Sequence, residues 1–232
     1  MLLIDAISTI GKFINTAVIS PSETYFGDQS QAYFGMVKVS DSALTKEIGL
    51  YDEIQNLSRI LTLFEDPNIE IEGNNLKIQE EDTEAYFITS DISLIRKGEF
   101  DQAGQLQKTL EAPKCLTVTF NDTLINRITK AAGTIDNASL IISSNEGKVS
   151  LQLKDIDVLS SDSNSLKIDI SSISEANKEF NVELDPSIAN RMPKGGFELQ
   201  LAFSERVGSY RAVFKQEQLT VVAACNPHNP EA

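Results

Sequence analysis

Short segments with the alternation and β-branched content of strands fill most of this sequence, and a few helical segments interrupt them. Turn residues such as Gly73-Asn74-Asn75 and Asn145-Glu146-Gly147 separate the strands. This pattern predicts an α+β fold. The expected strands are Val37–Val39, Ile69–Ile71, Leu76–Ile78, Lys148–Leu153, Leu166–Ile170, Phe180–Leu184, Phe197–Phe203, Tyr210–Phe214 and Leu219–Ala223.

Four segments place apolar residues on one helical face instead: Asp5–Ala17, Asp52–Phe64, Asp122–Ile135 and Asp185–Met192. Each opens at an aspartate, a residue suited to capping a helix N-terminus. The order of helix, several strands, helix and three strands occurs twice along the chain. This is a repeat of architecture and not of sequence.

The chain has 232 residues, which suits two domains of roughly 110 residues each or one large β-rich domain. Residues 96–113 contain Gly98, Gly104 and Pro113 and show no firm period, so we expect a connector between the domains there. The predicted division is a first domain over 1–97, a connector over 98–113 and a second domain over 114–232.

The charge is strongly negative, with 20 Lys+Arg against 34 Asp+Glu and a formal net charge of −14. A simple nucleic-acid binder needs cations to neutralise phosphates. Either the chain avoids DNA, or its cations are gathered on one surface while its acids lie elsewhere. The hydrophobic fraction of 41% is enough for packed cores.

Residues that commonly carry catalysis or bind metal are scarce. The chain has two cysteines, Cys115 and Cys225, which lack CxxC spacing, and one histidine, His228. We therefore expect no His/Cys metal site, no cofactor and a reduced compartment. No P-loop, strand-associated GxGxxG or HExxH motif occurs, so we expect no enzymatic activity. Acid pairs such as Asp155/Asp157 could bind a divalent cation, but they are more simply explained as solvated residues of acidic loops.

The sequence has no signal-like N-terminus and no long apolar run, so we expect a cytoplasmic protein.

The cations of the predicted helices lie away from the apolar stripes. They are Lys12, Arg59, Arg127, Lys130 and Arg191, with Lys194 just past the fourth helix. The acids of these segments stand at the N-terminal turns, where the helix dipole favours them. Taken singly, each cation is explained as an ordinary solvated residue. Taken together, they indicate a surface that touches phosphates without reading bases and so can slide along a duplex.

Two stretches resemble the DNA polymerase sliding clamps of T-even-type bacteriophages, which are relatives of proliferating-cell nuclear antigen. Leu50–Leu63, followed by Asn68–Ile71 and Asn75–Ile78, is similar to the second helix and following hairpin of the phage clamp's first domain. Ile188–Met192 with Gly196 and Phe197–Phe203 resembles its last helix and strand. The connector departs from the phage pattern, because it is rich in Gln and Gly where the phage connector is rich in Pro.

The resemblance implies a two-domain DNA-clamp fold with two βαβββ halves in each domain. Outer antiparallel sheets would surround a central hole that is lined by the helices, in a head-to-tail ring trimer. It implies a processivity factor in phage DNA replication, in the cytoplasm of the host cell. Its partners would be double-stranded DNA, held topologically and without sequence specificity, a DNA polymerase and a clamp-loader ATPase.

The resemblance also implies two kinds of protein contact. Subunits would join through Tyr86, Phe87 and Ile88 of one copy and Leu166, Ile168 and Ile170 of the next, although each of these side chains could equally belong to a core. Partner peptides would dock on a pocket near the connector and the C-terminal tail, or these residues simply pin the connector to a sheet. The pocket residues are Leu106, Leu110, Pro113, Val222, Cys225 and Pro227.

Two other functions fit the composition. An acidic DNA mimic would use contiguous rows of carboxylates to occupy a basic nucleic-acid-binding site. A β-rich virion structural protein would assemble without any dependence on DNA. The native mass is the first observation that separates these functions from a trimeric clamp.

Overall fold

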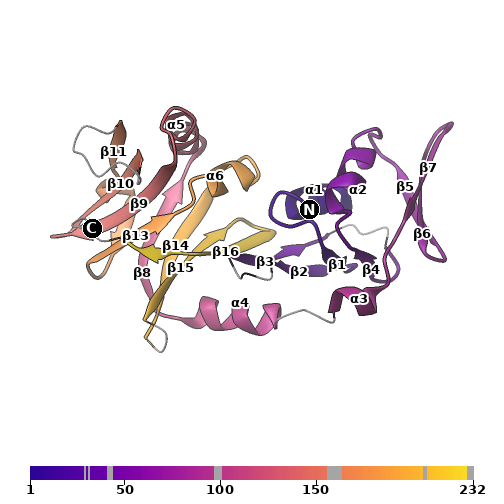
Figure 1. Cartoon of the computed structure of the whole chain (residues 1–232), viewed down its shortest axis with the longest axis horizontal. Coiled ribbons are helices and arrows are strands. Elements are labelled where there is room, and N and C mark those ends of the chain that lie inside the picture. The colour runs from indigo at the N-terminus through magenta and orange to yellow at the C-terminus, as the bar shows by residue number, and fades with distance from the viewer. Residues whose placement is uncertain are drawn as a thin grey trace. The chain divides into compact units, whose positions relative to one another are not determined.

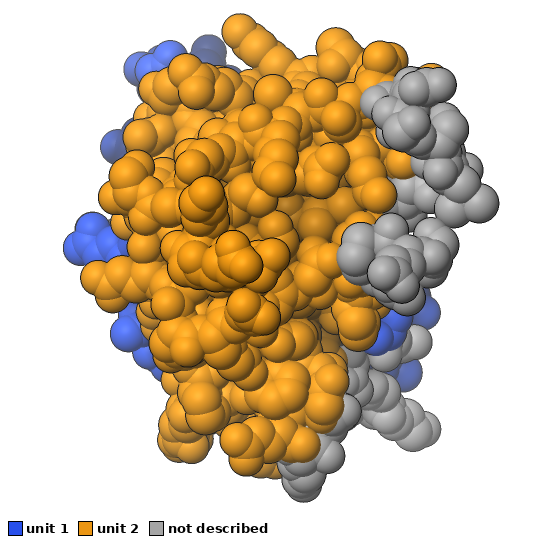
Figure 2. All heavy atoms as spheres, turned by 90° about the vertical axis from the view of Figure 1, so that its left-hand side faces the viewer, with its two compact units in different colours: residues 1–106, 217–221 blue, residues 107–216, 222–232 orange. Residues whose placement is uncertain are grey.

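The computed structural model of the chain (Figure 1) describes residues 1–28, 30, 32–40, 44–96, 101–155, 164–205 and 208–228. The chain divides into two compact units, which Figure 2 colours separately. Unit 1 contains residues 1–106 and 217–221, and unit 2 contains residues 107–216 and 222–232. The fold is a mixture of helices and antiparallel sheets, as the alternation of strand-like and helical segments predicts.

Unit 1 packs two adjacent helices with short sheets. The helices α1 and α2 contact each other, and their buried faces are aliphatic, with Ile7, Ile10, Ile54, Leu57 and Leu61 almost fully enclosed. β1 pairs with β4, β2 pairs with β3, and β5-β6-β7 form a three-stranded sheet. The elements are α1 (Leu3–Ile10), β1 (Ala17–Ile19), β2 (Glu23–Gly27), β3 (Tyr33–Lys38), β4 (Ile48–Leu50), α2 (Ile54–Leu61), β5 (Asn68–Glu72), β6 (Asn75–Glu80), β7 (Thr83–Ile88) and α3 (Ile92–Arg96).

Unit 2 also combines a pair of contacting helices with antiparallel sheets. One sheet has the strand order β11-β10-β9-β13-β17, and in another β8 lies between β12 and β14, which pairs with β15. The helices α5 and α6 contact each other. The elements are β8 (Lys114–Phe120), α5 (Asp122–Ala132), β9 (Ala138–Asn145), β10 (Lys148–Asp155), β11 (Ser165–Asp169), η1 (Ser171–Ile173), β12 (Ser174–Ala176), β13 (Phe180–Leu184), α6 (Ile188–Arg191), β14 (Phe197–Ser204), β15 (Ser209–Lys215) and β17 (Asn226–Pro227). The strand β16 (Leu219–Ala224) has its first three residues in unit 1 and its last three in unit 2.

The helix boundaries correct the sequence prediction. All four expected helices exist, but each is shorter than its amphipathic segment. The expected aspartate caps are wrong for all four of them. Asp5 lies inside the first turn of α1, Asp52 has a positive φ of 54°, and α5 is capped by Asn121, whose side chain accepts a hydrogen bond from the Leu124 backbone N–H at 2.9 Å. Asp185 instead binds the N–H of Ser187 at 2.8 Å, ahead of the four-residue α6.

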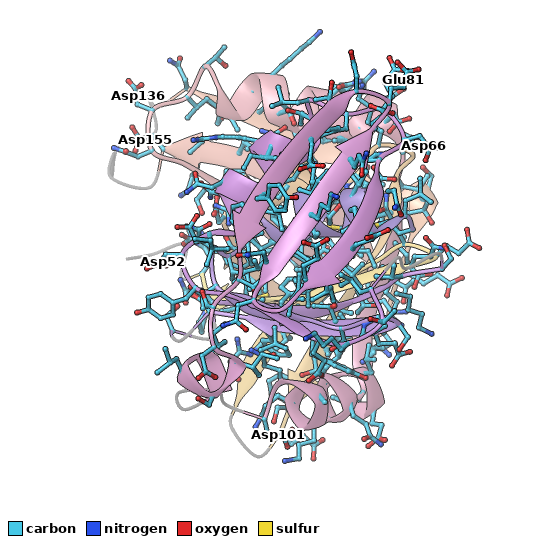
Figure 3. The ribbon with its side chains drawn as sticks, turned by 90° about the vertical axis from the view of Figure 1, so that its right-hand side faces the viewer. Asp52, Asp66, Glu81, Asp101, Asp136 and Asp155 are labelled. Atoms are coloured by element: carbon cyan, nitrogen blue, oxygen red, sulfur yellow. The ribbon has the colours of Figure 1, made fainter. Side chains whose placement is uncertain are left out.

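The segment expected to be an irregular connector is largely helical. The helix α4 spans Gln102–Glu111, and α3 precedes it. Asp101 begins α4, because its carboxylate accepts a hydrogen bond from the backbone N–H of Gly104 at 2.9 Å. Figure 3 labels this aspartate. The boundary between the compact units falls inside α4, between residues 106 and 107.

Candidate functional surfaces

The exposed face of the unit 1 helix pair carries two cations. Arg59 lies on α2 and is exposed. Lys12 is also exposed, but it lies in the turn after α1, so its expected place on a helix is wrong. Asn15 holds this turn to the start of α2: its Oδ1 accepts from the Gln55 N–H at 2.9 Å and its Nδ2 donates to the Asp52 carbonyl at 2.8 Å. The two cations therefore stand on a hydrogen-bonded scaffold.

The helix pair of unit 2 carries four cations. Arg127 and Lys130 are exposed and three residues apart on α5, so they share one face. Arg191 is half-buried at the end of α6, with a guanidinium nitrogen 3.7 Å from the carboxylate of Asp185. Lys194 is exposed in the loop that follows α6. Four of the six expected phosphate-contacting residues thus lie on a helix, and Lys12 and Lys194 lie two and three residues past the ends of α1 and α6.

Hydrogen bonds tie α5 to α6 and to the loop carrying Lys194. The Thr129 hydroxyl donates to Asn190 Oδ1 at 2.6 Å, which joins the two helices. The backbone N–H of Gly195 donates to Asp122 Oδ1 at 3.1 Å. The cations of unit 2 therefore stand on a rigid, hydrogen-bonded assembly.

The acidic side chains of unit 1 collect around its three-stranded sheet. Glu80 accepts the backbone N–H groups of Asp66 at 2.6 Å and Glu65 at 3.0 Å, and these bonds hold the pKa of the Glu80 carboxyl below its usual value. Figure 3 shows Asp66 and Glu81 projecting at the rim of this sheet. Since β5, β6 and β7 hold one cation, Lys77, among their acids, negative charge dominates this sheet.

Both strands expected at the subunit contact, β7 and β11, lie at sheet edges. Within the described residues, β7 pairs with β6 alone, and β11 pairs with β10 alone. On β7, the side chains of Tyr86 and Ile88 are 55% and 75% exposed, while Phe87 points inward and is buried. On β11, Leu166 and Ile168 are half-buried, and Ile170 lies just past the strand and is buried. Phe87 and Ile170 therefore serve the cores of their own units.

Tyr86 is held in place on the outer face of the β5-β6-β7 sheet. Its hydroxyl donates to the Glu84 carboxylate, and this bond raises the pKa of Tyr86. The same carboxylate lies 3.2 Å from the Lys77 ammonium. Both hydrogen bonds lower the pKa of Glu84, the Tyr86 bond most. The edge thus offers an ordered aromatic side chain.

The expected partner-peptide residues differ in accessibility. Leu106, Val222 and Cys225 are buried, and burial raises the pKa of the Cys225 thiol to about 12. Leu110 is half-buried and Pro113 is exposed, and Pro227 is exposed in β17, where it pairs with Val182 of β13. In this structure the first three side chains pack into cores, so only the last three are available to a ligand.

A cleft that the sequence did not predict lies over the sheet of unit 2. Its volume is about 760 Å³, and Ser143, Ser150 and Asn181 contribute to its lining together with Lys148 and Lys167. The hydroxyls of Ser143 and Ser150 are 3.0 Å apart. Small polar residues alternating along β9 and β10 are a weak signal of such a cleft, because they are also typical of any solvated sheet face.

Neither a metal-binding cluster nor a membrane-spanning helix occurs in the part of the chain that the structure describes. No group of three or more His, Cys, Asp or Glu side chains is arranged to hold a metal ion there. The described helices are all too short or too polar to cross a membrane. Asp157 of the Asp155/Asp157 pair lies outside the described residues.

Solved structures that are similar to this chain include DNA sliding clamps. The chain is similar to PCNA of A. fulgidus, solved with the C-terminal region of FEN-1 (TM-score 0.67, 14% identity, 98% of this chain and 96% of that chain). It is similar to PCNA of Thermococcus kodakaraensis (TM-score 0.66, 13% identity, 96% and 95%). A putative DNA polymerase III beta subunit from Eubacterium rectale matches with TM-score 0.65 and 12% identity, but this chain spans only 64% of its length.

These likenesses establish the fold. No protein-family model matches the sequence, and no curated protein matches it. The predicted resemblance to the fold of sliding clamps is therefore confirmed. The narrower resemblance to phage clamps stays a prediction.

Proposed function

We propose that this chain is one subunit of a DNA sliding clamp that encircles duplex DNA and tethers a replicative polymerase. Three copies would close head to tail into a ring, with the helices toward the hole and the sheets outside. Each unit would comprise two βαβββ halves, as in the orders β4-α2-β5-β6-β7 and β8-α5-β9-β10-β11. The phage type, with replication in the cytoplasm of the host cell, is the most specific form of the proposal.

The observation that carries the ring is the pair of edge strands. The resemblance pairs β7 of one subunit with β11 of the next, and each of these strands has a single neighbour among the described residues. An open edge invites pairing with another chain, and ring closure removes it. Because the two edges differ, the contact is heterologous, and such contacts form a ring when the rotation closes.

Side chains at the two edges complement each other. The outer face near β7 offers exposed Tyr86 and Ile88 together with the acid Glu84. On β11, Lys167 is exposed and the apolar Leu166 and Ile168 are half-buried. Apolar side chains stand at both edges, and this favours the pairing because each strand would cover apolar surface of the other.

The mechanism is topological. A clamp-loader ATPase would open one interface, and the ring would close around primed DNA. A polymerase bound to the ring could then leave the template only by releasing the ring, so tethering keeps its effective concentration at the primer end high. Free DNA would bind weakly because the chain carries a net charge of −14. Accessible Leu110, Pro113 and Pro227 would contribute to the partner site.

Native mass and a processivity assay test the proposal together. A clamp has a native mass of three times 25.5 kDa and increases polymerase processivity on circular primed DNA, with much less effect on linear DNA from which a ring slides off. A monomer that inhibits nucleic-acid enzymes would instead establish the acidic DNA mimic. An assembly indifferent to DNA would establish the virion structural protein.

A further inference from the structure

The two helix pairs differ in charge. In unit 1, the pair and its flanks (residues 1–16 and 51–66) contain two cations, Lys12 and Arg59, and five acids. In unit 2, the corresponding segments (residues 121–136 and 185–196) contain four cations and three acids. The helical surfaces are thus not equivalent, although both belong to pairs of helices packed side by side.

The exposed faces also differ, with two exposed cations in unit 1 and three in unit 2. No residue of α1 is a cation, and its exposed charged side chain is Asp5. The exposed side chains of α2 and its following turn include Gln55, Thr62 and Leu63, with Arg59 as the one cation of that helix. Leu63 is 74% exposed. A neutral or apolar surface of this kind gives phosphates little attraction.

In unit 2, most of the nearby acids serve local structure. Asp122 accepts the Gly195 N–H at the start of α5, and Asp185 accepts the Ser187 N–H at 2.8 Å. Carboxylates bound to backbone N–H groups near a helix N-terminus are partly compensated by the helix dipole. Arg127, Lys130 and Lys194 are exposed, whereas Arg191 shares its charge with Asp185.

We propose that the α5–α6 surface of unit 2 is the principal phosphate-contacting surface of this chain, and that the α1–α2 surface of unit 1 contributes little attraction for DNA. This inference rests on the proposed sliding-clamp function. In a ring of identical copies, cationic surfaces would alternate with nearly neutral ones. Only the α5–α6 surface of each copy would then attract the duplex. Fewer phosphate contacts mean weaker binding, which suits sliding.

Two matched double variants test the inference. Arg127→Gln/Lys130→Gln and Lys12→Gln/Arg59→Gln each remove two exposed cations and change the net charge equally. Any difference between them therefore reports the location of the charge and not its total. All four side chains are exposed, so the fold should tolerate both variants.

The measurement is fluorescence anisotropy of a labelled short duplex with the full-length oligomer, over a series of KCl concentrations. Each phosphate contact contributes about 0.9 to the slope of log affinity against log salt, so the unit 2 variant should reduce the slope by about 1.8 and weaken low-salt binding about tenfold. The unit 1 variant should change affinity less than about threefold, since fewer of its cations release counterions.

Equal losses in the two variants, a larger loss in the unit 1 variant, or no loss in either would overturn the inference while leaving the clamp itself standing. The native mass and the wild-type DNA binding are recorded in the same experiment. A wild-type protein that is monomeric and shows no salt-dependent binding to the duplex would instead defeat the proposed function. The failures of the two ideas are therefore distinguishable.

Discussion

The exposed side chains of β7 allow a sharp test of the subunit contact. The perturbation is the double substitution Tyr86→Ala/Ile88→Ala, which removes both outward-facing apolar groups and leaves the backbone hydrogen-bonding groups of the strand intact. Because the two side chains are 55% and 75% exposed within one chain, their truncation leaves the core of unit 1 nearly unchanged. Any large effect should therefore appear in assembly and not in folding.

The magnitude follows from the area that a neighbouring subunit would cover. Aromatic side chains bury about 150–250 Å² in total, so the exposed part of Tyr86 amounts to roughly 80–140 Å² and about 2–3 kcal/mol at about 25 cal/mol per Å². Fully burying an isoleucine contributes about 1.5–3 kcal/mol, of which three quarters remains for Ile88. Allowing for incomplete cover, we expect a loss of about 3 kcal/mol per interface, or roughly a hundredfold weaker association.

The assay is sedimentation velocity over a dilution series, with Leu63→Ala as the matched control. Leu63 is 74% exposed, close to the exposure of Ile88, but it lies in the turn after α2 and outside the proposed contact. The wild type and the control should remain trimers at concentrations where the double variant sediments as a 25.5 kDa monomer. If the double variant kept the trimer as well as the control does, β7 would not be the subunit contact.

Three further outcomes follow from local contacts. Asn121→Ala should destabilise unit 2 by about 0.5–2 kcal/mol in urea unfolding because it removes the cap of α5, whereas Thr123→Ala, which removes no cap, should have a smaller effect. Glu80→Gln should reduce the loss of thermal stability on acidification. The pKa of Glu80 is lower in the folded protein than its unfolded value of 4.5, so the ionised carboxylate stabilises the fold fully above pH 4.5. This stabilisation is lost as the pH falls through the folded pKa, and the glutamine variant lacks that dependence. Cys115 and Cys225 are buried and burial raises both thiol pKa values, so Ellman's reagent should modify neither in the native protein and both after unfolding; rapid native labelling would contradict the packing.

The strands were the more predictable part of the fold. All nine expected strands overlap observed strands, because alternation of apolar and polar side chains is a local property; two of them, Val37–Val39 and Leu166–Ile170, run one residue past the observed end. Other strands were missed, among them the long β8 and β9 and several short ones. Of the short ones, β1 has three residues, all buried, and shows no alternation. A buried strand of this length cannot be distinguished from the rest of a core by periodicity.

Helix starts were less predictable because neighbouring residues compete for the cap. Asn121 and Asp122 are both good capping residues, and only the backbone conformation, extended at Asn121, decides that its side chain takes the role. The helix α4 was missed for a related reason. Its only buried residue is Leu106, so it shows no apolar stripe, and Gly104 is unfavourable inside a helix. Asp101, which caps its start, was the one residue that favoured a helix here.

The positions of residues on the candidate functional surfaces could be predicted only in part. The cationic residues of α5 were correctly placed on an exposed face because helical periodicity determines direction. Whether Phe87 or Tyr86 faces outward on β7 also follows from period two, once the register is known. The edge position of β7 and β11 does not, because it depends on which strands fail to find a neighbour. That is a non-local property of the folded chain.

The acidity of the chain and a function on DNA are compatible if charge is divided by surface. The Debye length at physiological salt is about 8 Å, so a carboxylate farther than this from a phosphate has little influence on it. Acids that lie farther than this from the bound duplex can therefore contribute to the net negative charge without weakening the contacts that Arg127 and Lys130 would make. Lowering the ionic strength lengthens this range and should make the whole chain repel DNA more strongly. Wild-type affinity should then rise less steeply at the lowest salt than counterion release alone requires, and a slope that stays constant throughout would show that the distant acids exert no such repulsion.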